Sequence, residues 1–360
     1  MGHIKFHYSI QNLITPIENI VNELEYGNTF ALYLQKEIII PLKLGNFNWI
    51  SWENTETSFT LTVNDTFFDK AYFFEKILTS FIYNLQDFGK IKLEKIDLNK
   101  SIFQSELLSP FSKNNLSIFN KSDLILGTII KPYYHLSLDD KINMAKQFSK
   151  YGFKTIKNDE CYFTSKKQLI NEAIIIQKEL QNSSFYIPNI THLIHDYNSI
   201  EQLIKAGIKI VMVNVLVVGF RSINLLKIKF PELKIWGHRV GYSQLSEIIS
   251  MNTLSILLTL SGIDFLHIGT PVTQNEIDNR FEIINSSRVI NKNFKPIFTK
   301  TTPEVNKKII KTLKTTPIYL GCGFFRNNKS EIDWGKVDIW QKEAKKYYPK
   351  NNNYLNNGTK

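Results

Sequence analysis

From Leu124 onward, short apolar runs alternate with amphipathic stretches, and this rhythm constrains the fold more than any other feature of the chain. The apolar runs are residues 124–131, 153–157, 185–191, 208–216, 234–238, 265–270, 295–300 and 316–323. The segment between the first two runs has helical spacing, with Ser137 placed to cap the helix and Gly152 placed to end it. Eight strands with intervening helices are typical of a (β/α)8 barrel, an α/β fold whose active site lies at the C-terminal ends of the strands.

The N-terminal third lacks this rhythm and predicts a smaller α+β domain. It contains predicted strands over residues 30–34, 38–41 and 58–63, and predicted helices over residues 17–24 and 70–83. We therefore divide the chain into an N-terminal α+β domain over residues 1–115, a barrel over residues 116–345, and an Asn-rich tail over residues 346–360 that we expect to be disordered.

The charge of the chain is compatible with an anionic partner, and a compositional bias toward Lys, Asn and Ile explains it about as well. The net charge is +11 and the pI is about 9.3, but most lysines are interspersed with Asn and Ile rather than gathered in a basic block. We therefore expect neither nucleic acid nor a membrane surface as partner. A phosphorylated substrate is compatible with this distribution.

Cysteine content and hydropathy indicate a cytoplasmic protein. The two cysteines, Cys161 and Cys322, form no C-x-x-C pair and predict a reduced protein without structural disulfides. No apolar run reaches the length of a membrane span, and the first residues lack the apolar centre of a signal peptide.

The second apolar run ends in a cluster of charges, Lys157-Asn158-Asp159-Glu160. Two carboxylates at the end of a barrel strand can supply oxygen ligands to Mg²⁺. The lysine would repel the metal unless burial removes its proton and the amine captures CO₂ as a carbamate, which is a third oxygen ligand. The same four residues also suit a solvated charged loop.

The sequence Gly127-Thr128-Ile129-Ile130-Lys131-Pro132 precedes this cluster by one helix. Together the two motifs resemble the first two barrel strands of ribulose bisphosphate carboxylase (RuBisCO) and its relatives. The resemblance implies that Lys157 is carbamylated, that it binds Mg²⁺ with Asp159 and Glu160, and that Lys131 assists enolisation of the substrate.

Later strand ends extend this resemblance. His238-Arg239 is similar to the family's pair that binds the substrate and its distal phosphate, and the motif L-S-G-x-D-x-x-H-x-G-T at residues 260–270 places His267 as a further substrate or phosphate ligand. Gly321 and Gly323 keep two glycines of the family's phosphate-binding nest after the eighth strand. Asn214, at the end of the fourth strand, suits either an amide facing the site or a buried, hydrogen-bonded side chain.

The N-terminal domain carries a second, more specific resemblance. Gly89-Lys90-Ile91-Lys92-Leu93 resembles a segment of the diketo-methylthiopentyl phosphate enolases, which implies that Lys90 is the base that removes a substrate proton. Asn84 matches an asparagine that faces the substrate in carboxylases. The family also implies a homodimer in which the N-terminal domain of one subunit covers the barrel mouth of the other.

Two departures argue against carboxylation. Gln274 stands where the carboxylases carry a lysine beside the newly formed carboxylate, and Tyr133 replaces another lysine of their pattern. We therefore expect a RuBisCO-like (form IV) protein that performs Mg²⁺-dependent enolisation or isomerisation of a phosphorylated keto-sugar, of the methionine-salvage type. The alternatives are a sugar-acid phosphate decarboxylase or carboxylase of the same family, and a barrel that binds ligands without catalysis.

Overall fold

The chain forms two compact units. The computed structural model describes residues 2–26, 50–65, 68, 72–99, 118–119, 124–271, 273–299, 301–313, 318–320, 325–327 and 331–347. One unit comprises residues 1–110 and 241–261, and the other comprises residues 111–240 and 262–360. The predicted domain boundary near residue 115 lies outside the described residues, and so does the predicted tail 346–360 apart from Lys346 and Tyr347, which end the helix Trp334–Tyr347.

The N-terminal unit is built on an antiparallel sheet in the order β2-β3-β1-β4. The strands are β1 His3–Leu13, β2 Ile50–Asn54, β3 Ser58–Asn64 and β4 Gly89–Asp97. Alternate side chains of β1 are buried, among them Phe6, which stacks on Phe81 with ring centroids 4.4 Å apart. This sheet therefore has one buried face, as expected for an α+β unit.

Several helices belong to the same unit. They are α1 Ile17–Tyr26, α3 Phe73–Leu78, η3 Thr79–Tyr83, η4 Asn84–Phe88, α9 Tyr242–Leu245 and α10 Met251–Ser261. The predicted helix 17–24 and strand 58–63 are confirmed, and the predicted helix 70–83 corresponds to α3 followed by η3. The predicted strands 30–34 and 38–41 fall outside the described residues, and β1 and β2 were not predicted.

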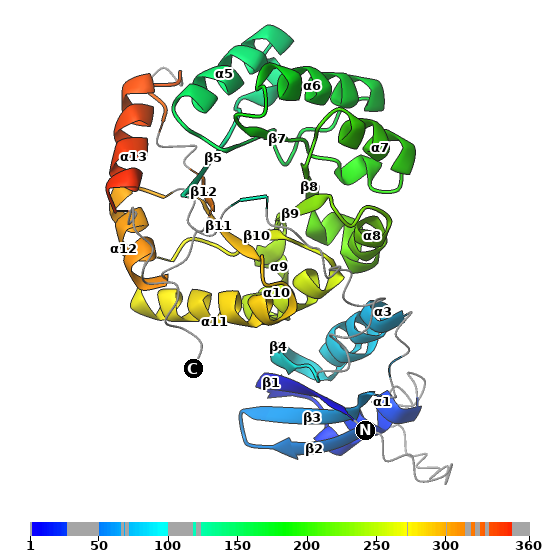
Figure 1. Cartoon of the computed structure of the whole chain (residues 1–360). Coiled ribbons are helices and arrows are strands. Elements are labelled where there is room, and N and C mark those ends of the chain that lie inside the picture. The colour runs from blue at the N-terminus through cyan, green and yellow to red at the C-terminus, as the bar shows by residue number, and fades with distance from the viewer. Residues whose placement is uncertain are drawn as a thin grey trace. The chain divides into compact units, whose positions relative to one another are not determined.

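The second unit is a (β/α)8 barrel, which confirms the predicted fold class (Figure 1). Its parallel strands follow the order β7-β6-β5-β12-β11-β10-β9-β8. They are β5 Ile125–Ile129, β6 Thr155–Lys157, β7 Phe185–Ile187, β8 Ile210–Asn214, β9 Lys234–His238, β10 Phe265–His267, β11 Lys295–Thr299 and β12 Ile318–Leu320. The ring closes between β7 and β8, where Ile190 N donates to Met212 O at 2.9 Å and Met212 N donates to Pro188 O at 2.8 Å.

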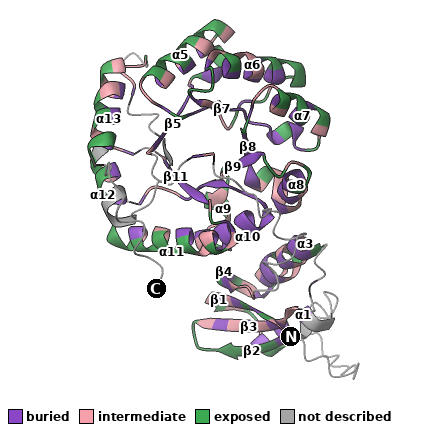
Figure 2. Cartoon of the chain, in the orientation of Figure 1, coloured by how far each residue is buried: buried purple, intermediate pink, exposed green. Residues whose placement is uncertain are grey.

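Helices surround the ring of strands, with exposed residues outside and buried residues toward the strands (Figure 2). They are α5 Leu138–Lys150, α6 Lys166–Glu179, α7 Tyr197–Lys205, α8 Val215–Lys229, α11 Gln274–Ile290, α12 Pro303–Leu313 and α13 Trp334–Tyr347, with short turns η5 Tyr133–His135 and η6 Thr191–Leu193. Helix α5 shows the predicted cap, because Ser137 Oγ accepts a hydrogen bond from Asp140 N at 3.1 Å. Gly152, at φ +85°, supplies the left-handed residue that ends the helix.

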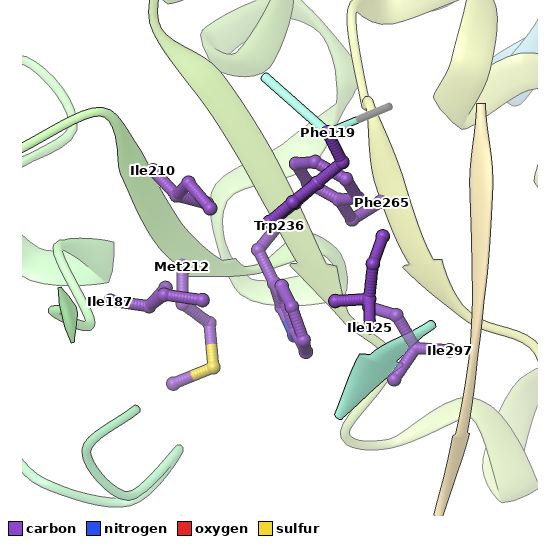
Figure 3. Packing of buried hydrophobic residues seen from close by; sticks show 8 residues of the cluster. All are labelled: Phe119, Ile125, Ile187, Ile210, Met212, Trp236, Phe265 and Ile297. Carbon is purple, nitrogen blue, oxygen red and sulfur yellow. The ribbon is translucent and has the colours of Figure 1, made fainter. Parts of the chain in front are cut away.

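The barrel interior is packed with side chains from the strands (Figure 3). The cluster consists of Phe119, Ile125, Ile187, Ile210, Met212, Trp236, Phe265 and Ile297. The ring of Phe119 contacts the rings of Phe185 and Phe265, the first residues of β7 and β10. Phe119 therefore lies at the N-terminal ends of the strands and leaves the C-terminal ends to polar residues. No helix in the described ranges is both long and apolar enough to cross a membrane.

A buried ion pair ties α8 to the start of β10. Lys227 Nζ lies 2.9 Å from Asp264 Oδ2 and donates to Leu233 O at 2.8 Å, and neither side chain is more than 2% exposed. Asp264 Oδ2 also accepts from Ile235 N at 2.9 Å. Removing one partner of a buried pair leaves an uncompensated charge in the interior, which is strongly destabilising.

We predict that Asp264→Ala lowers the free energy of unfolding by about 3–5 kcal/mol. Glu201→Ala is the control, because Glu201 pairs with Lys205 at 3.0 Å on the exposed face of α7, where such a pair contributes about 0.5 kcal/mol or less. Urea unfolding followed by circular dichroism measures both. Equal losses in the two variants would show that the buried pair does not stabilise the barrel.

Candidate functional site

Lys157 is the last residue of β6, and its side chain is only 3% exposed. Its Nζ lies 3.2 Å from Glu160 Oε2 and donates to Asn158 O at 3.2 Å. Strand β6 is in the middle of the barrel wall, with β5 on one side and β7 on the other. The lysine amine is therefore held inside the C-terminal mouth of the barrel, away from bulk water.

Lys131 joins the two carboxylates from the neighbouring strand. It follows β5, and its Nζ lies 3.0 Å from Asp159 Oδ2 and 3.4 Å from Glu160 Oε1. Asp159 Oδ1 also accepts from Cys161 N at 2.9 Å. The four residues that the sequence placed at two strand ends thus form one charge cluster of two amines and two carboxylates.

The main chain of this loop is fixed by two asparagines from the next strands. The side-chain amides of Asn189 and Asn214 both donate to Glu160 O at 2.9 Å. Asn189 is itself held by Thr191, whose hydroxyl donates to its Oδ1 at 2.6 Å. Asn214 therefore adopts the structural role that the sequence left open, although its buried Oδ1 has no hydrogen-bond partner among the described residues.

Burial and the neighbouring charges set the protonation of the cluster. Burial lowers the pKa of Lys157, and Glu160 only partly offsets this effect. Burial would raise the pKa of Glu160, but the charges of Lys157 and His238 outweigh it and lower the pKa to about 2. Burial would lower the pKa of Lys131, yet its hydrogen bond to Asp159 and the charge of Glu160 raise it. The pKa values of the two lysines are thus shifted in opposite directions, so Lys157 releases its proton more readily than an ordinary lysine and Lys131 holds its proton more tightly.

Two histidines extend the site along β9 and β10. The rings of His238 and His267 meet at 4.7 Å with an interplanar angle of 66°, and His238 Nε2 lies 3.9 Å from Glu160 Oε2. Trp236 Nε1 donates to His267 Nε2 at 2.8 Å, so that nitrogen is unprotonated. Burial and the nearby lysine Lys157 lower the pKa of His238 to about 4, and burial also lowers the pKa of His267 well below its ordinary value. Both imidazoles are neutral at physiological pH.

The guanidinium groups of two arginines, Arg239 and Arg280, come together at the turn after β10. A methyl group built on Gly269 would lie 2.8 Å from Arg239 Nη2 and 3.3 Å from Arg280 Nη2, so both guanidinium groups reach the turn after β10. Arg280 Nε also donates to Gly269 O at 3.0 Å. The sequence predicted Arg239 here but not Arg280, which lies in α11 and carries no motif. Gly269 has φ +82° and no side chain, which leaves room for both groups.

The other predicted site residues lie elsewhere. Asn84 begins η4 and Lys90 is an exposed residue of β4, both in the N-terminal unit. Gly321 and Gly323 lie outside the described residues. Gln274 is the first residue of α11, where its side chain donates to Asp278 Oδ1 at 3.0 Å.

His192 and His195, a pair that the sequence did not assign to metal, line an open cavity of about 580 Å³ together with Asp196. The ring of His192 contacts Phe163, and His195 Nε2 lies 3.3 Å from Ser222 Oγ. Nowhere in the described ranges do three His, Cys, Asp or Glu side chains group closely enough to hold a metal ion.

The residues at the barrel mouth nevertheless fit Mg²⁺ when Lys157 is included. Asp159 and Glu160 offer two carboxylates, and the buried amine of Lys157 can gain oxygen atoms only by reaction with CO₂. Buried polar atoms without a hydrogen-bond partner in the described part of the chain lie on the same strand ends: Asn158 Nδ2, Asn214 Oδ1 and His238 Nδ1. Such atoms are uncommon in folded proteins and are consistent with a site that receives further groups.

Sequence comparisons match this chain to proteins of one family. The family described as "Ribulose bisphosphate carboxylase large chain, catalytic domain" matches residues 109–318. The ribulose bisphosphate carboxylase of Methanocaldococcus jannaschii is 24% identical over 215 residues, covering 52% of this chain and 51% of that protein. An uncharacterized ribulose bisphosphate carboxylase-like protein of Bordetella bronchiseptica is 25% identical over 157 residues, covering 40% of this chain and 37% of that protein. The matches to carboxylases span about half the length of those relatives.

Solved structures show the same fold over nearly the whole chain. A rubisco-like protein from Burkholderia fungorum has a TM-score of 0.71 at 15% identity, covering 97% of this chain and 94% of the other. The dimeric archaeal Rubisco from Hyperthermus butylicus has a TM-score of 0.73 at 15% identity, covering 96% and 90%. Rubisco-like proteins and carboxylases are therefore about equally similar in fold.

We predict that His267 makes stability depend on pH. Its pKa in the folded chain is well below the ordinary value of 6.5, so between pH 7 and pH 5 only the unfolded chain binds a proton there. The free energy of unfolding should therefore fall by up to about 2 kcal/mol over this range from this group alone. The His267→Gln variant keeps an acceptor for Trp236, but the titrating group is gone. Its free energy of unfolding, measured with urea, should therefore fall less between pH 7 and pH 5. Equal pH slopes in the two proteins would show that the folded chain protonates His267.

Proposed function

The chain belongs to the ribulose bisphosphate carboxylase large-chain family, and on that premise we propose that it is a RuBisCO-like protein that enolises a phosphorylated keto-sugar with the help of Mg²⁺. The observation that carries the proposal is the buried amine of Lys157 beside two carboxylates at the barrel mouth. Burying a lysine is costly. The cost is reduced when the amine becomes a carbamate that binds a metal, which is the state that the family generally uses.

Lys157, Asp159 and Glu160 would hold the metal. The lone pair of the free Lys157 amine forms a bond to the carbon of CO₂, one pair of a C=O bond moves to oxygen, and an amine proton leaves to water. The product is an anion with two oxygen atoms. The lowered pKa of Lys157 supports this step, because only the unprotonated amine can attack CO₂.

Once bound, Mg²⁺ would polarise a ketone oxygen and so acidify the neighbouring carbon. The side chains around it are suited to the proton transfers that enolisation needs. Lys131 keeps its proton and can donate a hydrogen bond to an oxygen that gains negative charge. The neutral imidazole of His238 can accept a proton. Lys90 of the N-terminal domain, or the Lys157 carbamate, is the proposed base.

Arg239 and Arg280 are suited to a phosphate. Guanidinium groups bind phosphate through paired, charge-assisted hydrogen bonds, and two of them meet at Gly269. The neutral His267 lies next to His238 and can add a hydrogen bond. We propose that these groups, with Asn84 and the glycines Gly321 and Gly323, bind the phosphorylated substrate.

The turn after β10 supports enolisation without carboxylation. Thr273 caps α11 through a capping box with Glu276, and Gln274 is the first helical residue, where its amide is bonded to Asp278. No ammonium group stands at the position where the carboxylases keep one. The sequence around Lys90 favours a substrate of the methionine-salvage type, and the family resemblance favours a homodimer.

We predict that the protein exchanges a substrate proton for deuterium in D₂O when Mg²⁺, bicarbonate and the correct ketose phosphate are present. Proton NMR of a panel of ketose phosphates, including methylthio-sugar phosphates, measures the exchange. Lys157→Ala should slow it at least about 100-fold, as expected for loss of a central catalytic group. Lys90→Ala tests which base acts.

Lys154→Ala is the matched control, because Lys154 precedes β6, is exposed, and its amine donates to Ser183 O at 3.3 Å rather than to a carboxylate of the charge cluster. Its exchange rate should equal that of the wild type. Absence of both exchange and Mg²⁺ binding in the wild type would contradict the proposal and favour a barrel without catalysis.

We predict that Arg239→Gln and Arg280→Gln each raise KM for the phosphorylated ketone by about 10-fold or more, since a hydrogen bond to a charged group contributes about 1.5–3 kcal/mol. The unphosphorylated ketone is the control, and its exchange rate should not change. If both substrates are affected equally, the arginines do not bind the phosphate.

A further inference from the structure

A second buried polar cluster lies next to the charge cluster and is centred on Glu172 of α6. Glu172 is only 5% exposed and pairs with Lys141 of α5, which is 3% exposed, at an Nζ to Oε1 distance of 3.0 Å. Neither residue belongs to a motif, and within the described part of the chain neither contacts a group assigned to the proposed reaction.

Two tyrosine hydroxyls share the Glu172 carboxylate. Tyr133 OH donates to Glu172 Oε2 at 3.3 Å, and Tyr162 OH lies 3.2 Å from both carboxylate oxygens. Gln168, one turn earlier in α6, donates to Tyr162 OH at 3.2 Å and to Glu172 Oε1 at 3.1 Å. Tyr133 also forms a hydroxyl pair with Tyr186 of β7.

The two tyrosines come from the two loops that build the charge cluster. Tyr133 is two residues after Lys131, and Tyr162 is two residues after Glu160. The Glu172 carboxylate therefore connects the loop after β5 to the loop after β6. A second connection lies further out, where Tyr134 OH donates to Cys161 O and accepts from Phe163 N at 3.0 Å.

Stability alone does not account for this arrangement. A buried ion pair is often no more stabilising than apolar residues of the same size, because desolvation offsets the Coulomb attraction. The Glu172 carboxylate also fixes the orientation of the two loops, because it accepts hydrogen bonds from a tyrosine of each loop. The ammonium of Lys141 lies 4.2 Å from the centre of the Tyr133 ring and 5.1 Å from that of Tyr162, which orients both rings further.

We propose that Glu172 is a positioning residue of the metal site, which acts through Tyr133 and Tyr162 to fix Lys131 relative to Asp159 and Glu160. This inference rests on the proposed function. Asp159 and Glu160 now contact the amines of Lys131 and Lys157, and they would have to turn from these amines to act as ligands of Mg²⁺. The hydrogen bonds from Tyr133 and Tyr162 to Glu172 hold the loop after β5 and the loop after β6 in fixed positions while the carboxylates change partner. Asp159 and Glu160 therefore stay together, and Lys131 stays at the barrel mouth.

The test is Mg²⁺-dependent carbamate formation on Lys157 in a Tyr133→Phe/Tyr162→Phe variant of the full chain. Carbon-13 NMR with labelled bicarbonate detects the carbamate directly and needs no substrate. We expect the Mg²⁺ concentration for half-maximal signal to rise about 10-fold or more, the usual effect of removing groups that orient metal ligands. The double variant keeps the Lys141–Glu172 pair, so it leaves no unpaired charge in the interior.

Tyr151→Phe is the matched control, because Tyr151 lies at the opposite end of α5 and stacks on Trp334 with ring centroids 5.7 Å apart. Its half-maximal Mg²⁺ concentration should equal that of the wild type. Thermal unfolding of each metal-free variant separates positioning from folding. A double variant with a lower melting temperature but an unchanged Mg²⁺ dependence would overturn the inference and leave the proposed function intact. A wild type without any Mg²⁺-dependent carbamate would overturn both.

Discussion

The structure of the barrel mouth depends on the burial of one amine. Lys157 is 2% exposed, and removing an ammonium group from water costs several kcal/mol unless opposite charges and hydrogen bonds replace the solvent. Glu160 supplies the opposite charge, and Lys131 balances the two carboxylates from the other side. Each member of the cluster is therefore tolerable only because the others are present. The chemistry we propose follows from this arrangement, because a lysine that is costly to protonate is also the one most ready to react as a free amine.

Much of the fold could be predicted from the sequence because parallel strands buried on both faces appear as continuous apolar runs. All eight barrel strands were found in this way, and the cap at Ser137 and the stop at Gly152 were found from local chemistry. Strand β1 was missed although its signal is present: Ile4, Phe6 and Tyr8 are buried and alternate with polar residues, the pattern of a strand with one solvated face.

The candidate site was predicted from charges that stand together in the sequence and from motifs that resemble the family, which supplied Lys131, His238 and His267. Lys157, Asp159 and Glu160 stand within four residues, and their contacts follow from that spacing. The contacts of Asn189 and Asn214 with the Glu160 carbonyl depend on how the ring closes, which no local pattern encodes. Glu172 looks like any polar residue of an amphipathic helix, and Arg280 like any surface cation. Their roles arise from the loops that fold against them, so they became visible only in three dimensions.

The two asparagine amides that hold the Glu160 carbonyl have a consequence for how this barrel can change over evolutionary time. Both amides donate to the main-chain carbonyl of residue 160 and not to its side chain. This restraint on the loop therefore does not depend on which residue occupies position 160. A substitution there alters charge and ligand chemistry while the main chain keeps its course. A new ligand at position 160 therefore needs no new loop, provided that the new residue or a neighbour still compensates the buried amine of Lys157.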